Sequence, residues 1–283
     1  MPELPEVETM RRGVLGVKGC RIEGVQRLRC RLKPLTIHPT PGVFRRKVVG
    51  RTIVDVTRAG KRVVLNLDNH DAVIMEPRMT GLILISDPPN TEHLRFRLEL
   101  SGNGPQELLY WDRRGLGSVR LLDPKAFETQ LGPDKLGPDA LSVTLTQLRD
   151  RFHLGRRAIK VALLDQKTLA GIGNLYASEI LHVAGIAPQA HCNQLSKTQW
   201  RHLHIAMVDV LEEAIRHEGS TLSDGTYRTA LNSQGNYQNH HRVYDRAGED
   251  CNGCGNGVIQ RIVQNQRSTF YCPVCQAARS KRS

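Results

Sequence analysis

Four cysteines near the C-terminus constrain this chain more than any other feature of its sequence. Cys251 and Cys254 are separated by two residues, as are Cys272 and Cys275, and seventeen residues lie between the two pairs. Paired cysteines at this spacing are typical of a tetrahedral structural zinc site. We therefore predict one Zn²⁺ held by all four cysteines. Because four protein ligands leave no open position, the metal should stabilise the fold and take no part in catalysis.

The residues between the cysteine pairs predict a β-hairpin. Residues 258–263 and 268–271 alternate between apolar and polar side chains, as strands do, and the polar residues 264–266 join them. Arg267 follows this turn and should lie near the tip of the hairpin. A segment of about 30 residues buries little apolar surface, so zinc binding should supply much of its folding free energy.

The composition of the chain is strongly basic. Its 283 residues include 40 lysines and arginines against 28 acidic residues, a formal charge of +12. This excess favours a polyanionic partner such as nucleic acid, although a basic protein without such a partner fits the charge as well. No apolar run approaches the ~20 residues that span a bilayer, and the N-terminus lacks the apolar core of a signal peptide. We therefore expect a cytoplasmic protein in which Cys20, Cys30 and Cys192 are buried or free thiols.

The N-terminal part of the chain has the pattern of a β domain. Residues 93–100 alternate cleanly, with one apolar face formed by Leu94, Phe96, Leu98 and Leu100. Shorter β-rich runs lie at 62–67, 72–75, 82–85 and 107–110. Turn residues separate these runs, which favours an antiparallel sandwich or barrel up to about residue 123.

The pattern changes near residue 130, where glycine–proline pairs indicate a linker. Helical periodicity then predicts helices over about 144–153, 156–166, 173–184 and 196–217. Residues 219–248 lose this periodicity, as functional or disordered loops do. We therefore predict an α+β protein with domains at 1–130, 131–248 and 249–283.

The first residues of the chain suggest a nucleophile. Met1 precedes a small residue and is a candidate for removal, which would leave Pro2 with a free secondary amine. Free α-amino groups in model peptides titrate near ~7.7–8.0, so a neutral fraction exists at cellular pH. A neutral amine can attack a carbonyl-like carbon and form an iminium intermediate. Glu3 lies beside it as a potential proton-transfer group.

The same residues also fit an ordinary helix start. Pro5 suits the first turn of a helix, and Glu3, Glu6 and Glu8 favour its N-terminus. An apolar stripe at helical spacing follows, formed by Val7, Met10 and Val14. Taken alone, these residues favour the helix start over the nucleophile.

A glycine-rich turn in the middle of the chain is a second indication of nucleic acid. Residues 169–179 pass through Gly171 and Gly173 into a predicted helix that begins near Asn174. Free N–H groups at a helix N-terminus bind anions, and an asparagine adds a side-chain donor. Lys160 lies on the preceding helix and is a candidate DNA-binding residue. An ordinary helix–turn–helix with a capping asparagine fits the same residues.

Together, residues 2–6, residues 171–179 and the four-cysteine hairpin resemble a bacterial formamidopyrimidine-DNA glycosylase from end to end. The resemblance implies an N-terminal antiparallel β-sandwich with a leading helix and a helical domain with a helix–two-turn–helix. A four-cysteine zinc β-hairpin completes the implied fold. The implied activity is that of a monomeric DNA glycosylase and apurinic-site lyase with one structural zinc. Such an enzyme removes 8-oxoguanine and formamidopyrimidines from damaged double-stranded DNA and cleaves the strand by β,δ-elimination.

The resemblance assigns catalytic roles to four residues. Pro2 resembles the Schiff-base nucleophile that attacks C1′ of the damaged nucleotide, and Glu3 resembles the proton donor for base release. Lys61 occupies the place of the lysine assigned to β-elimination. Arg267 resembles the arginine that grips phosphates around the lesion and assists δ-elimination. Asn174 resembles the phosphate-binding asparagine of the helix–two-turn–helix.

Other residues resemble DNA-contacting positions of the family. Met79 corresponds to the residue that fills the gap left by the flipped base, since an enzyme acting on a base must rotate it out of the duplex. Arg114 is expected to pair with the orphaned base, and Leu116 can act as an apolar wedge. His93 lies near a DNA-contacting histidine of the family.

The chain departs from the family pattern at several positions. Glu76 stands where the family usually has a histidine, and a carboxylate there should repel DNA phosphates. Gly115 stands where a second loop arginine is expected, and Leu116 replaces a stacking phenylalanine. The weaker stacking of Leu116 is expected to shift lesion preference or the choice of opposite base.

Two alternatives are compatible with the same motifs. An enzyme similar to endonuclease VIII would prefer oxidised pyrimidines, but Leu4-Pro5 and residues 174–178 look closer to the formamidopyrimidine branch. A non-catalytic DNA-binding relative would keep the zinc and helix motifs. Such a protein would have no need of an N-terminal secondary amine.

Overall fold

The computed structural model describes residues 2–30, 32–223 and 225–277. The chain forms two compact units, one comprising Met1–Lys135 with Ala214–Gln238 and the other comprising Leu136–Glu213 with Asn239–Ser283. Met1, whose removal the sequence suggests, lies outside the described residues, as do residues 278–283 of the predicted zinc domain. None of the described helices is both long enough and apolar enough to cross a membrane.

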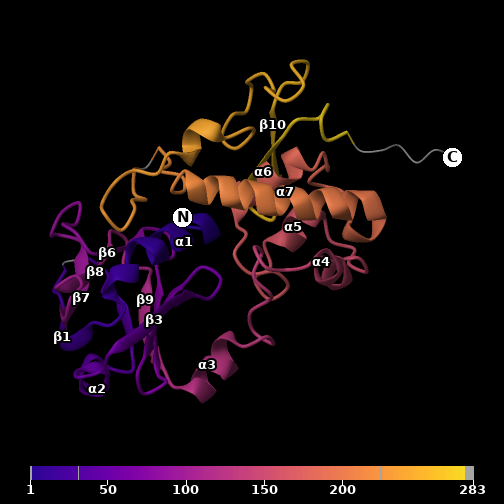
Figure 1. The fold of residues 1–283 in the computed structure, drawn as a ribbon. Coiled ribbons are helices and arrows are strands. Elements are labelled where there is room, and N and C mark those ends of the chain that lie inside the picture. Colours follow the sequence, from indigo (N-terminus) through magenta and orange to yellow (C-terminus); the bar gives the residue numbers. More distant parts are fainter. Residues whose placement is uncertain (1, 31, 224, 278–283) are drawn as a thin grey trace. The chain divides into compact units, whose positions relative to one another are not determined.

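The first unit contains two β-sheets (Figure 1). A four-stranded sheet has the order β1-β7-β8-β6, with strands Arg21–Arg27, Leu94–Ser101, Glu107–Asp112 and Gly81–Leu84. A five-stranded sheet has the order β2-β9-β5-β4-β3, with strands Thr36–His38, Ser118–Leu122, Ala72–Glu76, Val63–Leu67 and Ile53–Arg58. Only β2 and β9 pair in parallel among the described strands of these two sheets.

One hydrophobic core joins the two sheets. Leu98 and Leu108 of the four-stranded sheet belong to the same buried cluster as Leu65 and Val73 of the five-stranded sheet. The predicted sandwich is therefore confirmed. The apolar face predicted for β7 is also buried. The register shifts between Leu94 and Phe96, and the intervening Arg95 is buried as well.

Helices complete the first unit. They are α1 (Leu4–Gly13), the 3₁₀ helix η1 (Leu15–Val17), α2 (Pro41–Val48) and α3 (Pro124–Leu131). The predicted leading helix is thus present, and its stripe of Val7, Met10 and Val14 is completely buried. Its polar face carries Glu8, which lies 2.8–3.0 Å from nitrogens of Arg11, Arg12 and Arg58. Burial by itself would raise the pKa of Glu8, but these three arginines outweigh burial and lower the pKa to about 2.

Replacing Glu8 with Gln should lower the free energy of unfolding by about 2 kcal/mol at pH 7, because a neutral amide loses the charge-assisted bonds. The pKa of Glu8 lies below its ordinary value of 4.5 in the folded state. The carboxylate therefore stabilises the fold fully above pH 4.5, and this contribution disappears as the pH falls toward 2. Urea unfolding at pH 7 and pH 3 measures both effects.

The difference in stability between the parent and Glu8→Gln should shrink at pH 3. The matched control is Glu128→Gln, at an exposed glutamate of α3, which should change little at either pH. An equal loss of stability at both pH values in Glu8→Gln would contradict the ion-pair explanation.

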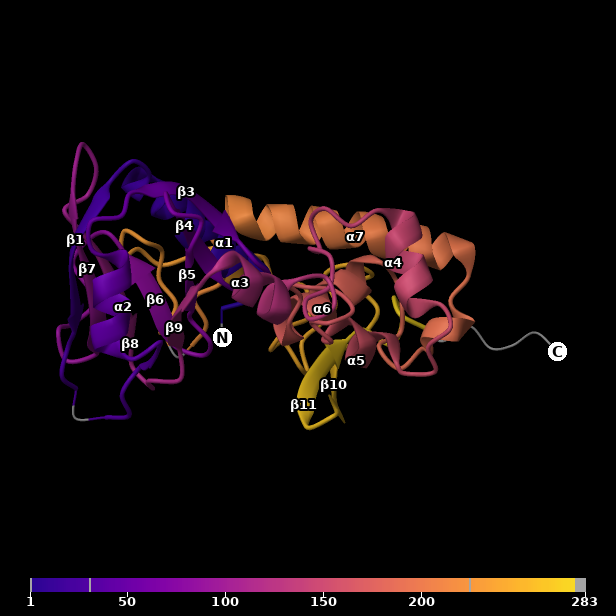
Figure 2. The same cartoon turned by 90° about the horizontal axis from the view of Figure 1, so that it is seen from below.

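The second unit is mainly helical (Figure 2). It contains α4 (Leu145–Phe152), α5 (Ile159–Leu163), α6 (Asn174–Val183) and η2 (Cys192–Gln194). The helix α7 (Lys197–Arg216) begins in this unit, and η3 (Tyr237–His240) and the hairpin strands β10 (Gln260–Gln264) and β11 (Arg267–Tyr271) follow. These helices confirm the predicted ones, although α5 is shorter than the predicted 156–166. The backbone groups of Arg157 and Ala158 instead pair with residues 191–192, so they do not join the hydrogen-bond ladder of the helix.

The segment 219–248 contains one short 3₁₀ helix and no strand among its described residues. Its first part belongs to the first unit. There the Ile85 amide donates to the carbonyl of Ala230 at 3.1 Å, and the Tyr227 hydroxyl donates to the carbonyl of Glu218 at 2.8 Å. Individual hydrogen bonds of this kind therefore fix the irregular segment, which has no sheet or helix ladder among its described residues beyond the short 3₁₀ helix.

Candidate functional sites

Pro2 and Glu3 are both buried and directly precede α1. The Glu3 amide donates to Glu6 Oε2 at 2.8 Å, and the Ser220 amide donates to Glu6 Oε1 at 2.9 Å. One carboxylate therefore fixes both the entrance to the helix and the distant segment at 220. The sequence pattern indicates for Glu6 only a general preference for helix N-termini. It gives no sign of this bridge, because the partner lies 214 positions away.

Lys61 lies in the turn between β3 and β4 and is half-buried. Arg58 spans the gap between this turn and α1. Its Nη1 donates to the carbonyl of Gly60 at 3.0 Å, and its Nε donates to Glu8 Oε2 at 3.0 Å. The Lys61 turn is therefore anchored to the same helix that follows Pro2 and Glu3.

Glu76, which departs from the family pattern, is surrounded by arginines. Its carboxylate oxygens lie 3.1 Å from Arg62, 3.7 Å from Arg78 and 3.9 Å from Arg120. The negative charge that the sequence places here is therefore offset within the first unit. Its repulsion of DNA phosphates should be weaker than the sequence alone suggests.

Two loops of the first unit meet at the buried carboxylate of Asp112. Its Oδ1 accepts from the Thr80 hydroxyl and from the Arg114 amide at 3.1 Å. Its Oδ2 accepts from the Gly117 amide at 2.9 Å. Thr80 directly follows Met79, whose side chain is exposed. Asp112 thus brings together the Met79 loop and the loop that carries the exposed Arg114, two of the predicted DNA-contacting residues.

The buried Arg95 supports this arrangement from inside the unit. It is 1% exposed, and its Nε donates to the carbonyl of Asp112 at 2.7 Å while Nη2 donates to the carbonyl of Arg113 at 3.2 Å. Alternation along residues 93–100 assigns residue 95 to the polar face of the strand and gives no sign of this role. The pairing register of β7 shifts at this residue, between Leu94 and Phe96.

The departure at Gly115 also has a structural reason. Gly115 has a φ of +61°, and a Cβ there would lie 2.1 Å from the carbonyl oxygen of Lys33. An arginine cannot occupy this position without moving the backbone. The neighbouring Leu116 is half-buried, so its predicted role as a wedge stays a prediction.

Asp112→Asn should lower the free energy of unfolding by roughly 2–3 kcal/mol. The side-chain amide nitrogen of Asn would face a buried N–H donor at a position where Asp112 has an acceptor oxygen. Thermal or urea unfolding measures this loss. The exposed Asp134 provides the control, since Asp134→Asn should leave stability within about 0.5 kcal/mol of the parent. Equal stability of the two variants would contradict the scaffold role of Asp112.

His93 packs edge-on against Trp111, with ring centroids 5.4 Å apart. Its side chain is 12% exposed. The predicted DNA contact of His93 stays a prediction, and the structure adds a packing role beside β7 and β8.

In the second unit, Lys160 is completely buried at the centre of a polar network. Its ammonium donates to Asn174 Oδ1 at 2.6 Å, the carbonyl of Ser268 at 3.0 Å and the Thr269 hydroxyl at 2.7 Å. The Asn174 amide also donates to the carbonyl of Ser268, at 2.9 Å. Lys160 therefore joins α5, α6 and the hairpin. This burial favours a positioning role for Lys160, whereas Asn174, the first residue of α6, retains its predicted phosphate contact as a prediction.

The four cysteines of the second unit form a metal-binding cluster. Their sulfur atoms all lie within 4.8 Å of one another. Cys251 and Cys275 are 3.7 Å apart, as are Cys254 and Cys272. Tetrahedral Zn–S bonds of about 2.3 Å place sulfurs about 3.8 Å apart. The cluster therefore fits Zn²⁺ closely, in agreement with the predicted site.

Arg267 is exposed and is the first residue of β11. The two residues before it, Asn265 and Gln266, adopt left-handed φ values of 45° and 59° and close the hairpin. The predicted position of Arg267 at the hairpin tip is confirmed.

Known families match both units of the chain. The formamidopyrimidine-DNA glycosylase N-terminal domain matches residues 1–119, and the formamidopyrimidine-DNA glycosylase H2TH domain matches residues 131–226. The zinc finger found in FPG and IleRS matches residues 248–278. The β-sandwich, the helical domain and the cysteine hairpin together define a zinc-containing DNA glycosylase of the helix–two-turn–helix class.

The chain belongs to the formamidopyrimidine-DNA glycosylase family. It is 40% identical to the formamidopyrimidine-DNA glycosylase of Chloroflexus aurantiacus, with 98% of each chain covered, and 39% identical to that of Bacillus subtilis, with 98% and 99% covered. Among solved structures, Lactococcus lactis Fpg bound to DNA containing an abasic site has a TM-score of 0.85 at 29% identity. A mutant of the Lactococcus lactis protein, bound to DNA containing Fapy-dG, has a TM-score of 0.84 at 31% identity. Both alignments cover 98% of this chain and 100% of the other.

These similarities confirm the family that the sequence motifs indicated, together with the α+β fold and the single structural zinc site. They also favour the formamidopyrimidine branch over the endonuclease VIII alternative, because the relatives named above carry the former name along the whole chain.

Proposed function

We propose that this protein is a base-excision repair enzyme that removes oxidised purines from damaged duplex DNA and then cleaves the strand. The observation that carries the proposal is the start of the first unit. Pro2 and Glu3 directly precede α1, and Arg58 anchors the Lys61 turn to the same helix. The relatives in complex with Fapy-dG and abasic-site DNA support the same substrate class.

In the proposed reaction, the nitrogen of Pro2 attacks C1′ of an extruded nucleotide while the bond from C1′ to the damaged base breaks. The departing base takes up the proton that the Pro2 nitrogen loses. Glu3 protonates O4′ as the C1′–O4′ bond breaks, which opens the sugar and leaves the iminium. The resulting iminium makes the neighbouring sugar protons acidic, so the 3′ and then the 5′ phosphate leave by elimination. We assign Lys61 to the first elimination and Arg267 to phosphate binding and the second elimination.

We further propose that the loops joined by Asp112 occupy the gap left by the extruded nucleotide. Met79 and Leu116 offer apolar wedges, and Arg114 offers hydrogen-bond donors to the orphaned base. Asn174 and His93 contact the DNA backbone. Lys160 positions the zinc hairpin. The formal charge of +12 supports binding of the duplex. We propose that the enzyme acts as a monomer in the bacterial cytoplasm.

A cleavage panel tests the substrate class. Duplexes containing 8-oxoguanine or a formamidopyrimidine should be cleaved at least tenfold faster than duplexes containing an oxidised pyrimidine, measured as single-turnover rates. A duplex containing an abasic site should be cleaved whichever type of damaged base the enzyme prefers. This cleavage is the control for an intact lyase centre. Faster cleavage of the pyrimidine lesion would favour the endonuclease VIII-like alternative, and no cleavage of any duplex would favour the non-catalytic one.

A further inference from the structure

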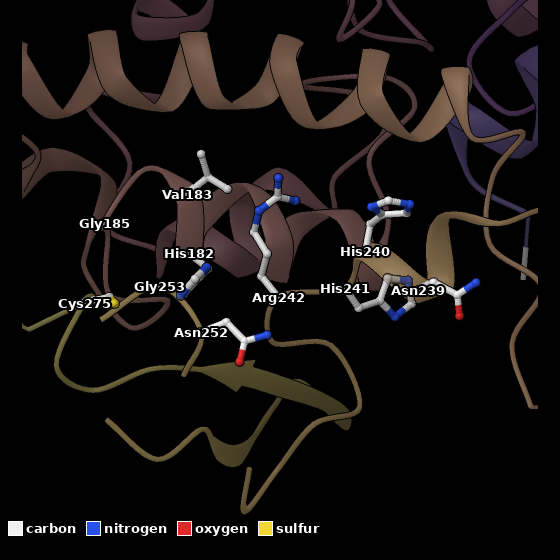
Figure 3. Close-up of a pocket in the computed structure, with 10 residues that line it drawn as sticks. All are labelled: His182, Val183, Gly185, Asn239, His240, His241, Arg242, Asn252, Gly253 and Cys275. Atoms are coloured by element: carbon white, nitrogen blue, oxygen red, sulfur yellow. The ribbon is translucent and has the colours of Figure 1, made fainter. Parts of the chain in front are cut away.

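A histidine of helix α6 contacts the zinc cluster. His182 lies in the last turn of α6 and points toward the loop of Gly253 (Figure 3). Its Nε2 lies 3.4 Å from the sulfur of Cys251, a predicted zinc ligand. The side chain is buried, with only 7% of the residue exposed. The motifs that identified the four cysteines do not include this residue.

The chemistry of the site fixes the direction of this hydrogen bond. A zinc-bound cysteine is a thiolate and has no proton to donate, so Nε2 of His182 must carry the proton. Nδ1 of His182 is shielded from solvent and has no hydrogen-bond partner among the described residues. No group in that part of the chain therefore draws the proton to Nδ1.

The surrounding backbone fits closely around this contact. A Cβ on Gly253 would lie 3.3 Å from Cε1 of His182 and 3.6 Å from the sulfur of Cys251. Glycine therefore lets the first cysteine loop close over the edge of the imidazole. A larger residue would press on the ring that makes the hydrogen bond.

The zinc hairpin is attached to α6 at both ends of the helix. Near its C-terminal end, the buried Gln276 donates to the carbonyl of Ile186 at 2.8 Å and accepts from the Cys272 amide at 2.9 Å. At its N-terminal end, Asn174 donates to the carbonyl of Ser268. The contact of His182 lies at the C-terminal attachment, where it joins the helix to a metal ligand itself.

We propose that His182 is a positioning residue of the zinc site, whose Nε2–H donates to the Cys251 thiolate and holds the finger on α6. Four thiolates around one divalent ion leave an excess of negative charge on sulfur, and a buried N–H donor stabilises that charge. Partners of this kind orient metal ligands, and their loss commonly weakens metal binding by about 10–100-fold. This role is independent of the proposed glycosylase chemistry.

Variants at position 182 test the proposal through metal binding. His182→Phe keeps an aromatic ring but has no donor, whereas His182→Gln keeps an N–H at a similar reach. Transfer of zinc to a colorimetric chelator should be about tenfold faster in His182→Phe, and close to the parental rate in His182→Gln. The exposed His202 of α7 gives the control His202→Phe, which should release zinc at the parental rate.

Cobalt substitution separates the hydrogen bond from general loosening of the fold. Without a donor, the sulfur lone pairs rise in energy, so the sulfur-to-Co²⁺ charge-transfer band of His182→Phe should move to longer wavelength. The band of His182→Gln should stay near the parental position. Parental band energy and parental zinc release in His182→Phe would overturn the proposal.

A measurement on the unmodified full chain keeps the proposal testable should His182→Phe fail to fold. In protein loaded with ¹¹³Cd, ¹⁵N-edited spectra should show His182 protonated at Nε2, with scalar coupling between that proton and the metal through sulfur. A ring protonated only at Nδ1 would overturn the proposal.

Discussion

Acetylation of the N-terminal amine should abolish borohydride trapping of this protein on DNA that contains an abasic site. Acetylated Pro2 has no lone pair available for attack at C1′, so no iminium forms for borohydride to reduce. We expect the yield of covalent adduct to fall by roughly 10³-fold or more, since removal of a nucleophile has effects of this size. Denaturing gels of the protein–DNA adduct measure the result.

Two controls make this experiment specific. Pro2→Gly retains a primary amine at the start of the chain and should trap DNA weakly but detectably. The acetylated protein should still bind abasic-site DNA in a gel-shift assay, which shows that the fold survives. Normal trapping after complete acetylation would exclude the α-amine as the nucleophile. Intact mass of the active protein shows whether Met1 has been removed, and a retained Met1 in active enzyme would also exclude it.

Removal of zinc should unfold the hairpin and lower DNA affinity by at least tenfold. Structural zinc sites contribute apparent binding free energies of about 10–16 kcal/mol in isolated fingers, far more than this short segment gains from apolar burial. The core of the hairpin supports this expectation, because Ile259 and Phe270 pack in one cluster with Cys251 and Cys272 themselves. Metal analysis measures the loss of zinc, circular dichroism measures the unfolding of the hairpin, and DNA titration measures the loss of affinity.

Matched variants distinguish loss of the metal from loss of one DNA contact. Cys272→Ser should release zinc and weaken binding as chelation does, whereas Cys192→Ser, at a buried thiol outside the cluster, should retain zinc. Arg267→Ala should leave the finger folded. It should weaken the salt dependence of DNA binding by the amount expected for the loss of about one phosphate contact. Unchanged DNA affinity in metal-free protein would contradict the structural role of the site.

The elements that sequence analysis predicted correctly are those defined by local pattern. The spacing of the four cysteines specified the zinc cluster because a tetrahedral ion needs two closely spaced pairs. The two-residue alternation of β7 and the helical spacing of Val7, Met10 and Val14 specified which faces are buried. Arg267 was placed at the hairpin tip because it follows the turn that joins two alternating runs.

The supporting residues could not be predicted in this way. Glu6 binds Ser220, Arg95 binds the carbonyl of Asp112, and Lys160 binds the carbonyl of Ser268. Each contact joins positions that no local periodicity relates. Arg95 is buried at an irregularity in strand pairing, although Leu94 and Phe96 on either side of it keep the core positions that alternation predicts.

The sequence by itself therefore determined the fold class, the zinc ligands and the family, because periodicity, spacing and motifs are local properties of a chain. Tertiary structure decided how the candidate residues are held. It surrounded Glu76 with three arginines, excluded a side chain at Gly115 and placed His182 against Cys251. The physical reason is that burial and hydrogen bonding depend on which distant segments meet, and only the packed chain brings those segments together.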